Sequence, residues 1–257
     1  MKVLSISDFH GQTEILKNLK SKIIYERPDL IVFTGDIVKG YARGNEWLAA
    51  LSQKRAFQEH LEEIVKEKAE DAYFYEAFYG FINELNIPFV SIPGNMDAPE
   101  KRYFSAAYDS ALNSKNINIV QENIIKYNDF IISGFGGEIT EDSKESFFVL
   151  VYPKMEIDYS LRRLKYIKEK KILLFHTPPI GSVVDIENNC HRGSIVVNDL
   201  IKIIKPTLVF CGHAHTAKGY EIIEGALVVN PGALKKGNYA LIDTRNMKVQ
   251  LKNCNDE

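Results

Sequence analysis

The stretch VLSISDFHGQTEILKNLKSKIIYERPDLIVFTGD, residues 3–36, decides the expected fold. It begins with a short apolar run, Val3–Ser7, which is typical of a buried strand. Apolar residues at helical spacing follow over Gln12–Glu26, and a second apolar run covers Leu30–Thr34. Strand, helix and strand in this order predict a sheet with helices packed against it. Polar residues just after such strands lie where open α/β sheets place their binding sites.

The rest of the chain continues this alternation of strands and helices. The elements expected after residue 36 are a mostly helical segment over Val38–Asn86, a strand over Ile87–Ile92, a helix over Pro99–Lys115, short strands over Ile117–Val120, Ile124–Tyr127 and Phe130–Ser133, a helix over Glu156–Lys170, a strand over Ile172–Phe175, a helix over Ser194–Ile204 with Ser194 as its N-cap, a strand over Leu208–Cys211 and β segments over Gly219–Leu251. No repeat or linker separates them, so one domain over residues 1–257 is the simplest organisation.

The segment Val38–Asn86 combines a helical excursion with an aromatic cluster. Aromatic side chains at helical spacing usually pack in the core. We therefore expect the following cluster to be buried: Tyr73, Phe74, Tyr75, Phe78, Tyr79 and Phe81. Residues 39–65 have two interpretations. They rise above the site as a cap, or they pair with another subunit in a homo-oligomer.

Composition sets limits on the partners. The 257 residues carry a net charge of −2, and 45% of them are hydrophobic, which is ordinary for a soluble globular protein. Nothing in this balance favours a nucleic acid as partner. No apolar stretch approaches the roughly 18 residues of a membrane span, and no secretory signal pattern begins the sequence. Three cysteines without CxxC spacing indicate reduced thiols, so we expect a cytoplasmic protein.

Five short motifs concentrate residues that can bind a metal, and each follows an expected strand. They are Asp8-Phe9-His10, Gly35-Asp36, Gly94-Asn95-Met96-Asp97, His176 and Gly212-His213-Ala214-His215, and they hold four of the six histidines. Taken alone, each has an ordinary interpretation: Asp-x-His is common, Gly-Asp and Gly-Asn are usual in turns, and a single histidine more often lies in the core or on the surface. All five in this order predict a hydrolytic site with two metal ions.

The types of ligand indicate which metals would fit. Imidazole and carboxylate suit Mn, Fe, Ni, Zn or Co, and the lack of cysteine near the motifs argues against a structural zinc site. Asp8 and His10 are close enough in sequence to reach one ion together. Asp36 directly follows Gly35, where the backbone can approach closely, as a bridging ligand requires.

This order of motifs resembles that of the calcineurin-like metallophosphoesterases, over residues 8 to about 245. The resemblance implies an α/β fold, a four-layer α/β/β/α sandwich of two mixed β-sheets flanked by helices. It also implies two divalent ions, Mn first among them, with ligands assigned as follows: Asp8, His10 and His215 for one ion, Asn95, His176 and His213 for the other, and Asp36 bridging both. We expect Asp36, Asn95 and His213 to be catalytic as well. In such enzymes a metal-bound hydroxide attacks phosphorus in line.

The chain departs from the family at its third motif. The usual histidine, which protonates the leaving oxygen or binds phosphate, is Met96 here, and a thioether cannot donate a proton. Asp97 thereby loses its usual partner. Either another group supplies the acid, or the enzyme favours good leaving groups such as aryl esters, or its activity is low. Substitution at this position also occurs in small phosphodiesterases of the family.

Four residues are candidates for contacting the substrate. His191 and Arg192 form a basic loop before a helix, which is the kind of place that binds an anion, although a plain surface loop fits equally well. Asp97 and Glu138 are the acidic candidates. We expect a phosphoesterase for a phosphodiester or a small phosphomonoester. The alternative is a scaffold protein that keeps the fold without turnover. Met96 and the aromatic helical segment favour it, and the complete ligand set opposes it.

Overall fold

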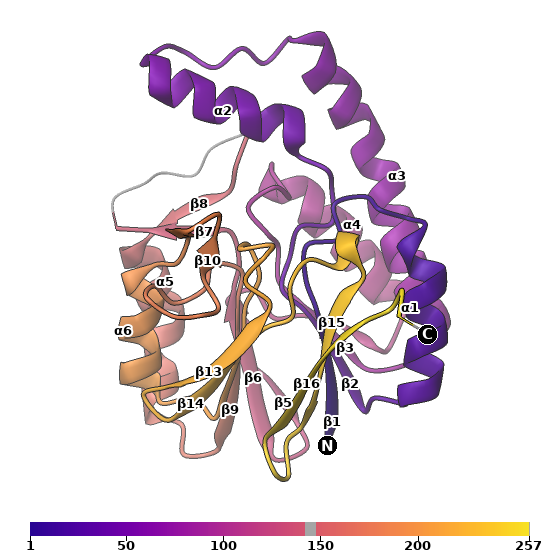
Figure 1. Ribbon diagram of the computed structural model, residues 1–257, viewed down its shortest axis with the longest axis vertical. Coiled ribbons are helices and arrows are strands. Elements are labelled where there is room, and N and C mark those ends of the chain that lie inside the picture. The colour runs from indigo at the N-terminus through magenta and orange to yellow at the C-terminus, as the bar shows by residue number, and fades with distance from the viewer. Residues whose placement is uncertain (142–147, 257) are drawn as a thin grey trace.

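Two six-stranded mixed sheets form the middle of the molecule (Figure 1). The computed structural model describes residues 1–141 and 148–256. The first sheet has the order β16-β15-β1-β2-β3-β4, built from β1 (Lys2–Ile6), β2 (Leu30–Phe33), β3 (Phe89–Ser91), β4 (Ile117–Ile119), β15 (Asn238–Asp243) and β16 (Lys248–Asn253). Strands β1 to β4 are parallel, with Val3 opposite Leu30, and β15 runs antiparallel to β1.

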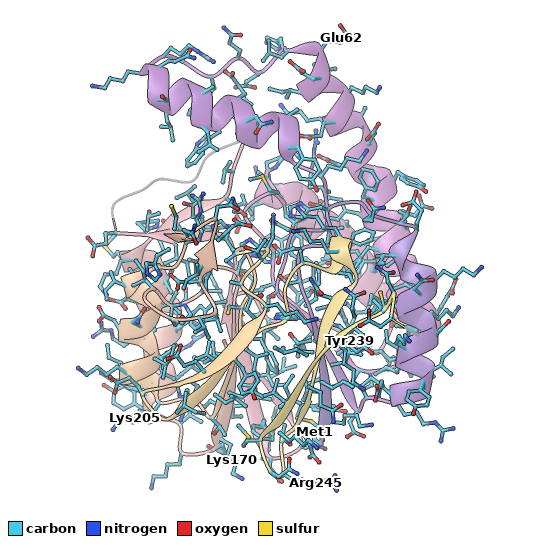
Figure 2. The ribbon with its side chains drawn as sticks, viewed as in Figure 1. Met1, Glu62, Lys170, Lys205, Tyr239 and Arg245 are labelled. Carbon is cyan, nitrogen blue, oxygen red and sulfur yellow. The ribbon has the colours of Figure 1, made fainter. Side chains whose placement is uncertain are left out.

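The second sheet has the order β13-β14-β12-β9-β6-β5. Its strands are β5 (Ile125–Tyr127), β6 (Phe130–Phe135), β9 (Lys170–Phe175), β12 (Leu208–Phe210), β13 (Gly219–Ile223) and β14 (Ala226–Asn230). The four central strands are parallel, whereas the edge strands β5 and β13 are antiparallel to their neighbours. Met1 and Lys170 lie at one end of the molecule (Figure 2), so the parallel strands of both sheets end at the opposite pole.

Helices cover the outer face of each sheet. The first sheet is covered by α1 (Ile15–Glu26), α3 (Glu62–Leu85) and α4 (Glu100–Asn113), and the second by α5 (Lys154–Leu161), the 3₁₀ helix η1 (Arg162–Tyr166) and α6 (Ile195–Ile204). One apolar core lies under each layer of helices and a third lies between the sheets. The predicted four-layer α/β/β/α sandwich is confirmed.

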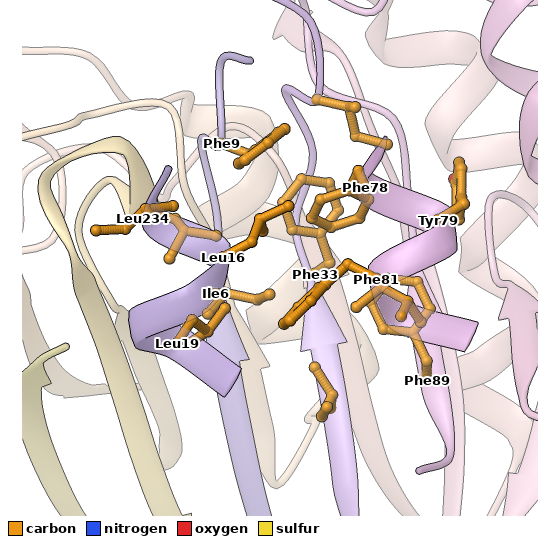
Figure 3. Close-up of a cluster of buried hydrophobic side chains, with 14 of the residues drawn as sticks. Ile6, Phe9, Leu16, Leu19, Phe33, Phe78, Tyr79, Phe81, Phe89 and Leu234 are labelled. Carbon is orange, nitrogen blue, oxygen red and sulfur yellow. The ribbon is translucent and has the colours of Figure 1, made fainter. Parts of the chain in front are cut away.

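The aromatic cluster of α3 packs as predicted, with one exception. Phe78 lies between Phe9 and Phe33, with ring centroids 5.2 and 4.6 Å away (Figure 3). The other cluster members are buried, except that 60% of Tyr73 is exposed. Burial of these rings fixes α3 against the first sheet, since each buried aromatic side chain contributes about 1.5–3 kcal/mol.

The remaining short elements connect the layers. They are the parallel pair β7 (Glu138–Thr140) and β8 (Val151–Pro153), the hairpin of β10 (Ile186–Glu187) and β11 (Cys190–His191), and the 3₁₀ helix η2 (Leu234–Lys236). Ser194 caps α6 as predicted, since its hydroxyl accepts a hydrogen bond from the backbone N–H of Val196. The helix predicted over Glu156–Lys170 is wrong at its end. The α-helix α5 stops at Leu161, the 3₁₀ helix η1 continues to Tyr166, and Lys170 already pairs with Phe130 in the sheet.

The excursion after β2 contains α2 (Tyr41–Gln53), which lies above the pole where the strands end (Figure 1). Its Arg43 is fully buried and is held by Glu67 and Asp71 of α3. In the part of the chain that the structure describes, none of the helices has the length and apolar character needed to cross a membrane.

Candidate metal centre

All seven ligand candidates lie at the same pole, just beyond the ends of strands. Asp8 and His10 follow β1, Asp36 follows β2, Asn95 follows β3, His176 follows β9, and His213 and His215 follow β12. Four of them, Asp8, His10, Asp36 and His213, have left-handed backbone conformations with φ between 48° and 67°. Such strained residues cluster at functional sites, and here they turn the chain sharply so that the side chains converge.

The first group of side chains consists of Asp8, His10, Asp36 and His215, whose ligand atoms all lie within 4.8 Å of one another. The Nε2 atoms of His10 and His215 are 3.0 Å apart. The distance from His10 Nε2 to Asp36 Oδ2 is 3.5 Å, and that from His215 Nε2 to Asp8 Oδ1 is 3.4 Å. Three of these residues are buried and His215 is partly exposed, so the group opens on one side only.

The second group surrounds the other side of Asp36. His176 Nε2 lies 2.9 Å from Asn95 Oδ1 and 3.5 Å from Asp36 Oδ2. The ring of His213 stands edge-on to that of His176, with centroids 5.3 Å apart. Asp36 Oδ2 is therefore equally far from His176 and from His10, and one carboxylate lies between the two groups.

Backbone carbonyls fix the orientation of two histidines. Nδ1 of His10 lies 3.2 and 3.1 Å from the carbonyl oxygens of Val38 and Lys39, and Nδ1 of His176 lies 2.7 Å from that of Thr34. A carbonyl can only accept, so Nδ1 carries the hydrogen in both rings. In the neutral form of either ring, Nε2 is then left with its lone pair pointing into the site, which is the usual arrangement of a metal-binding histidine.

Burial and charge set the protonation states of the site. Burial lowers the pKa of His10 to about 4 and that of His213 to about 3, so both imidazoles are neutral. Burial alone would raise the pKa of Asp36, but the nearby His176 and His10 lower it to about 2. Burial would likewise lower the pKa of His176, yet Asp36 raises it to about 9. The carboxylates thus attract positive charge to the space between the groups.

The donor atoms fit divalent cations. Asp8 Oδ2 is buried and finds no hydrogen-bond partner among the described residues. A buried carboxylate oxygen without a partner is costly, and a bound cation removes that cost. The other oxygen of this carboxylate, Oδ1, lies 3.4 Å from His215 Nε2 and 4.0 Å from His10 Nε2, and oxygen with imidazole nitrogen is a donor set that transition-metal ions accept.

Asp97 lies beneath the site instead of facing it. Its carboxylate accepts hydrogen bonds from the backbone N–H groups of Gly94 (2.8 Å), Asp36 (2.9 Å) and Ile37 (3.0 Å). Burial and the charge of Asp36 raise its pKa to about 7, while these donors act in the opposite direction. Backbone donors thus occupy this carboxylate, and Asp97 joins the loops that carry Asp36 and Asn95.

A cavity of about 290 Å³ opens above the two groups. Besides five of the ligand candidates, its lining comprises Gly40 together with Tyr41, Gly44, Asn45, Trp47 and Leu48 of α2, and Met96, Glu138, Val149, Glu187 and Arg192. Two of the expected substrate contacts, Glu138 and Arg192, therefore border the cavity. His191 does not, because its Nδ1 is 3.0 Å from both carboxylate oxygens of the buried Asp185.

The comparison with known proteins agrees with this geometry. The profile of the metallophosphoesterases of the calcineurin superfamily matches residues 1–254. The chain belongs to this family. The uncharacterized protein MJ1162 of Methanocaldococcus jannaschii is 24% identical over 263 residues, which cover 99% of this chain and 97% of that protein. One solved structure superposes with a TM-score of 0.87 at 34% identity, and TT1561 of Thermus thermophilus superposes with 0.77 at 25%, each over 98% of both chains.

The sequence did not identify several residues that line the cavity of this metallophosphoesterase. Tyr41, Trp47 and Leu48 come from α2, for which a position above the site was one of two interpretations and whose inward face depends on packing. Lys235 was also not identified, although it contacts a ligand candidate: its Nζ lies 3.2 Å from His215 Nδ1 and 3.3 Å from the Tyr41 hydroxyl. The position of Glu187 could have been found from the sequence. The dipeptide Asn188-Asn189 that follows it suits the tight turn of a two-residue hairpin, and both asparagines have positive φ in the structure.

Proposed function

We propose that this metallophosphoesterase is a binuclear enzyme that hydrolyses a phosphodiester or a small phosphomonoester. The single observation that carries the proposal is the position of Asp36 Oδ2, 3.5 Å from Nε2 of both His10 and His176. A carboxylate shared in this way is what a pair of divalent ions requires. The ligands proposed are Asp8, His10 and His215 for one ion, Asn95, His176 and His213 for the second, and Asp36 for both, with Mn first and Fe, Zn, Ni or Co as alternatives.

Two ions held there would supply Lewis-acid stabilisation and a water of lowered pKa. The chain's own residues would bind and orient the phosphoryl group. Arg192 is exposed on the cavity, and its guanidinium makes no hydrogen bond or ion pair with the residues that the structure describes, so it is available to phosphate oxygens. Glu138 borders the same cavity, where burial raises its pKa. A cavity of about 290 Å³ suits a small ester.

The test combines metal content with turnover. The protein is stripped with a chelator, reloaded with Mn²⁺ and assayed on bis(4-nitrophenyl) phosphate and 4-nitrophenyl phosphate. We expect two bound ions per chain and hydrolysis of at least one ester. Bound metal without turnover of either ester would instead support the scaffold alternative.

Three variants test the assignment of ligands. Asp36→Asn should lose both ions, whereas Asp8→Asn and Asn95→Ala should each weaken one. Residues that merely orient metal ligands change affinity by about 10–100-fold, so losing a direct ligand should cost more. If Asp36→Asn released one ion only, the bridging assignment would be wrong.

A further inference from the structure

The methionine that replaces the family histidine packs against two glycines at the start of α2. A Cβ atom at Gly40 would lie 2.6 Å from Cβ and 2.8 Å from Sδ of Met96. A Cβ atom at Gly44 would lie 3.0 Å from Met96 Cε. Gly40 precedes α2 directly and Gly44 lies on its first turn. The two glycines therefore leave a groove in the surface of α2, and the Met96 side chain fills it.

Further contacts hold α2 in the same position. Met96 and Trp47 pack on a small apolar cluster formed by Ile64, Phe148, Val149 and Val151. On the other side, Arg43 donates a 2.6 Å hydrogen bond to the carbonyl of Ala98, two residues beyond Met96. The loop that carries Asn95 and the helix above it are thus joined by an apolar contact and by a polar one.

Because of this packing, α2 forms an apolar wall above the ligand candidates. Trp47, Leu48, Met96 and Val149 all line the cavity. Leu48 is 60% exposed, so the fold itself leaves this large side chain uncovered beside the cavity. The cavity then has two unlike parts. Carboxylates, imidazoles and Arg192 form the part that suits a phosphoryl group, and mainly aliphatic and aromatic side chains form the other, to which α2 adds Asn45 and Tyr41 as polar residues.

We infer that the enzyme selects phosphoesters whose organic group is apolar and about as large as an aromatic ring, with Leu48 and Trp47 as the selecting side chains. The inference rests on the proposed function and specifies its substrate class. An organic group rich in hydroxyls, such as a sugar, would find only Asn45 and the Tyr41 hydroxyl on α2 to replace its hydrogen bonds to water, and the polar groups left unpaired strongly oppose binding. An apolar ring has no hydrogen bonds to water to lose, and it gains free energy by burying apolar surface against the wall.

The experiment compares two phosphonates that differ only in the organic group. Phenylphosphonate and methylphosphonate are titrated into the Mn²⁺-loaded protein, and their dissociation constants are measured by calorimetry. Partial burial of the ring predicts about tenfold tighter binding of phenylphosphonate, which corresponds to about 1.4 kcal/mol. Equal affinities would overturn the inference, as would failure of metal-loaded protein to bind either compound.

Two matched variants on α2 locate the selecting wall. Leu48→Asn replaces an apolar side chain by a polar one of similar size, so the phenyl preference should fall below about threefold while methylphosphonate binding stays unchanged. Leu51→Asn is the control, since Leu51 is 52% exposed on the same helix and does not line the cavity. An equal effect of both changes, or none from Leu48→Asn, would refute the assignment.

Phosphonate binding tests the substrate class, whereas ester hydrolysis tests the proposed function, so the two proposals can fail separately. If phenylphosphonate is preferred but no ester is hydrolysed, the enzymatic proposal fails and the apolar binding class remains. If esters are hydrolysed without any preference for the ring, the substrate class proposed here fails and the hydrolase remains.

Discussion

Replacing Arg43 by methionine should destabilise the protein by disconnecting α2 from α3. The Arg43 side chain is fully buried. Its Nε is 3.1 Å from Glu67, its Nη1 and Nη2 are 3.2 Å from the two carboxylate oxygens of Asp71, and Nη1 also bonds the carbonyl of Ala98. Methionine keeps much of the volume but none of these hydrogen bonds, so two buried carboxylates lose a cation.

The remaining contacts determine the size of the loss. Glu67 keeps the backbone N–H groups of Ala42 (2.9 Å) and of residue 43 (3.3 Å), and Asp71 keeps Arg102 at 3.0 Å. Removing one partner of a buried ion pair costs about 3–5 kcal/mol, and these surviving donors place Arg43→Met near the lower value, about 3 kcal/mol. For a chain of this size, that loss lowers the thermal midpoint by roughly 6–12 °C.

Urea unfolding at pH 7.5 measures the loss, and Arg102→Met is the control. Arg102 contacts the same Asp71, but 42% of its side chain is exposed, so its removal should cost under about 1 kcal/mol. If Arg43→Met lowered the free energy of unfolding by no more than Arg102→Met does, that result would refute the argument, because burial of the arginine would then make no difference to its contribution.

The loss of stability caused by Arg43→Met should depend on pH. Burial raises the pKa of Asp71 from 3.8 to about 6 despite the two arginines, so the folded state binds a proton more readily than the unfolded chain. This proton favours the folded state at low pH, and the benefit disappears as the pH rises through about 6. Arg43 attracts Asp71 only when the carboxylate is ionised. The loss caused by Arg43→Met should therefore be smaller at pH 5 than at pH 7.5, and the reverse order would contradict the explanation.

Three further predictions concern the site and α2. Arg192→Gln should weaken inhibition by inorganic phosphate about tenfold, as expected for one charge-assisted hydrogen bond, whereas His191→Gln should not, because His191 faces Asp185. Chelation should lower the thermal midpoint and Mn²⁺ should restore it, since an ion that binds only the folded state stabilises that state. In urea unfolding, Gly40→Ala should destabilise the protein by about 1–3 kcal/mol, because Gly40 has a φ of +64° and a Cβ atom there would collide with Met96. Gly80→Ala is the control: its Cβ atom would meet open space on α3, so it should stabilise the protein by up to about 1 kcal/mol.

The parts of the fold that depend on local pattern were predictable from the sequence. Each motif that holds ligand candidates follows an apolar run, so its position beyond the end of a strand needed no knowledge of the tertiary structure. The number of layers could not be predicted from local pattern, since periodicity predicts strands but does not say how they divide between sheets. The family resemblance supplied that step. The helix predicted through Lys170 was too long, because Lys170 pairs with Phe130 in the sheet and tertiary pairing overrides local helical spacing there.

The substrate side of the site was much less predictable, because it depends on which way neighbouring side chains face. His191 and Arg192 are adjacent, yet one is held by Asp185 and the other borders the cavity. Asp97 looked like a substrate contact and is instead covered by backbone donors. Cytoplasmic location and assembly into a homo-oligomer stay predictions.

The methionine at position 96 is best understood together with α2. An unbranched thioether can lie along the groove left by Gly40 and Gly44, whereas a rigid imidazole would also need a hydrogen-bond partner. Asp97 cannot easily be that partner, because backbone N–H groups already occupy its carboxylate. Replacing Met96 by histidine would therefore displace α2 before it restored an acid. The substrates inferred above would need such an acid less, since an aryl group leaves as a stabilised anion and requires little protonation. A methionine at position 96 is thus consistent with the substrate class that we propose for the apolar wall.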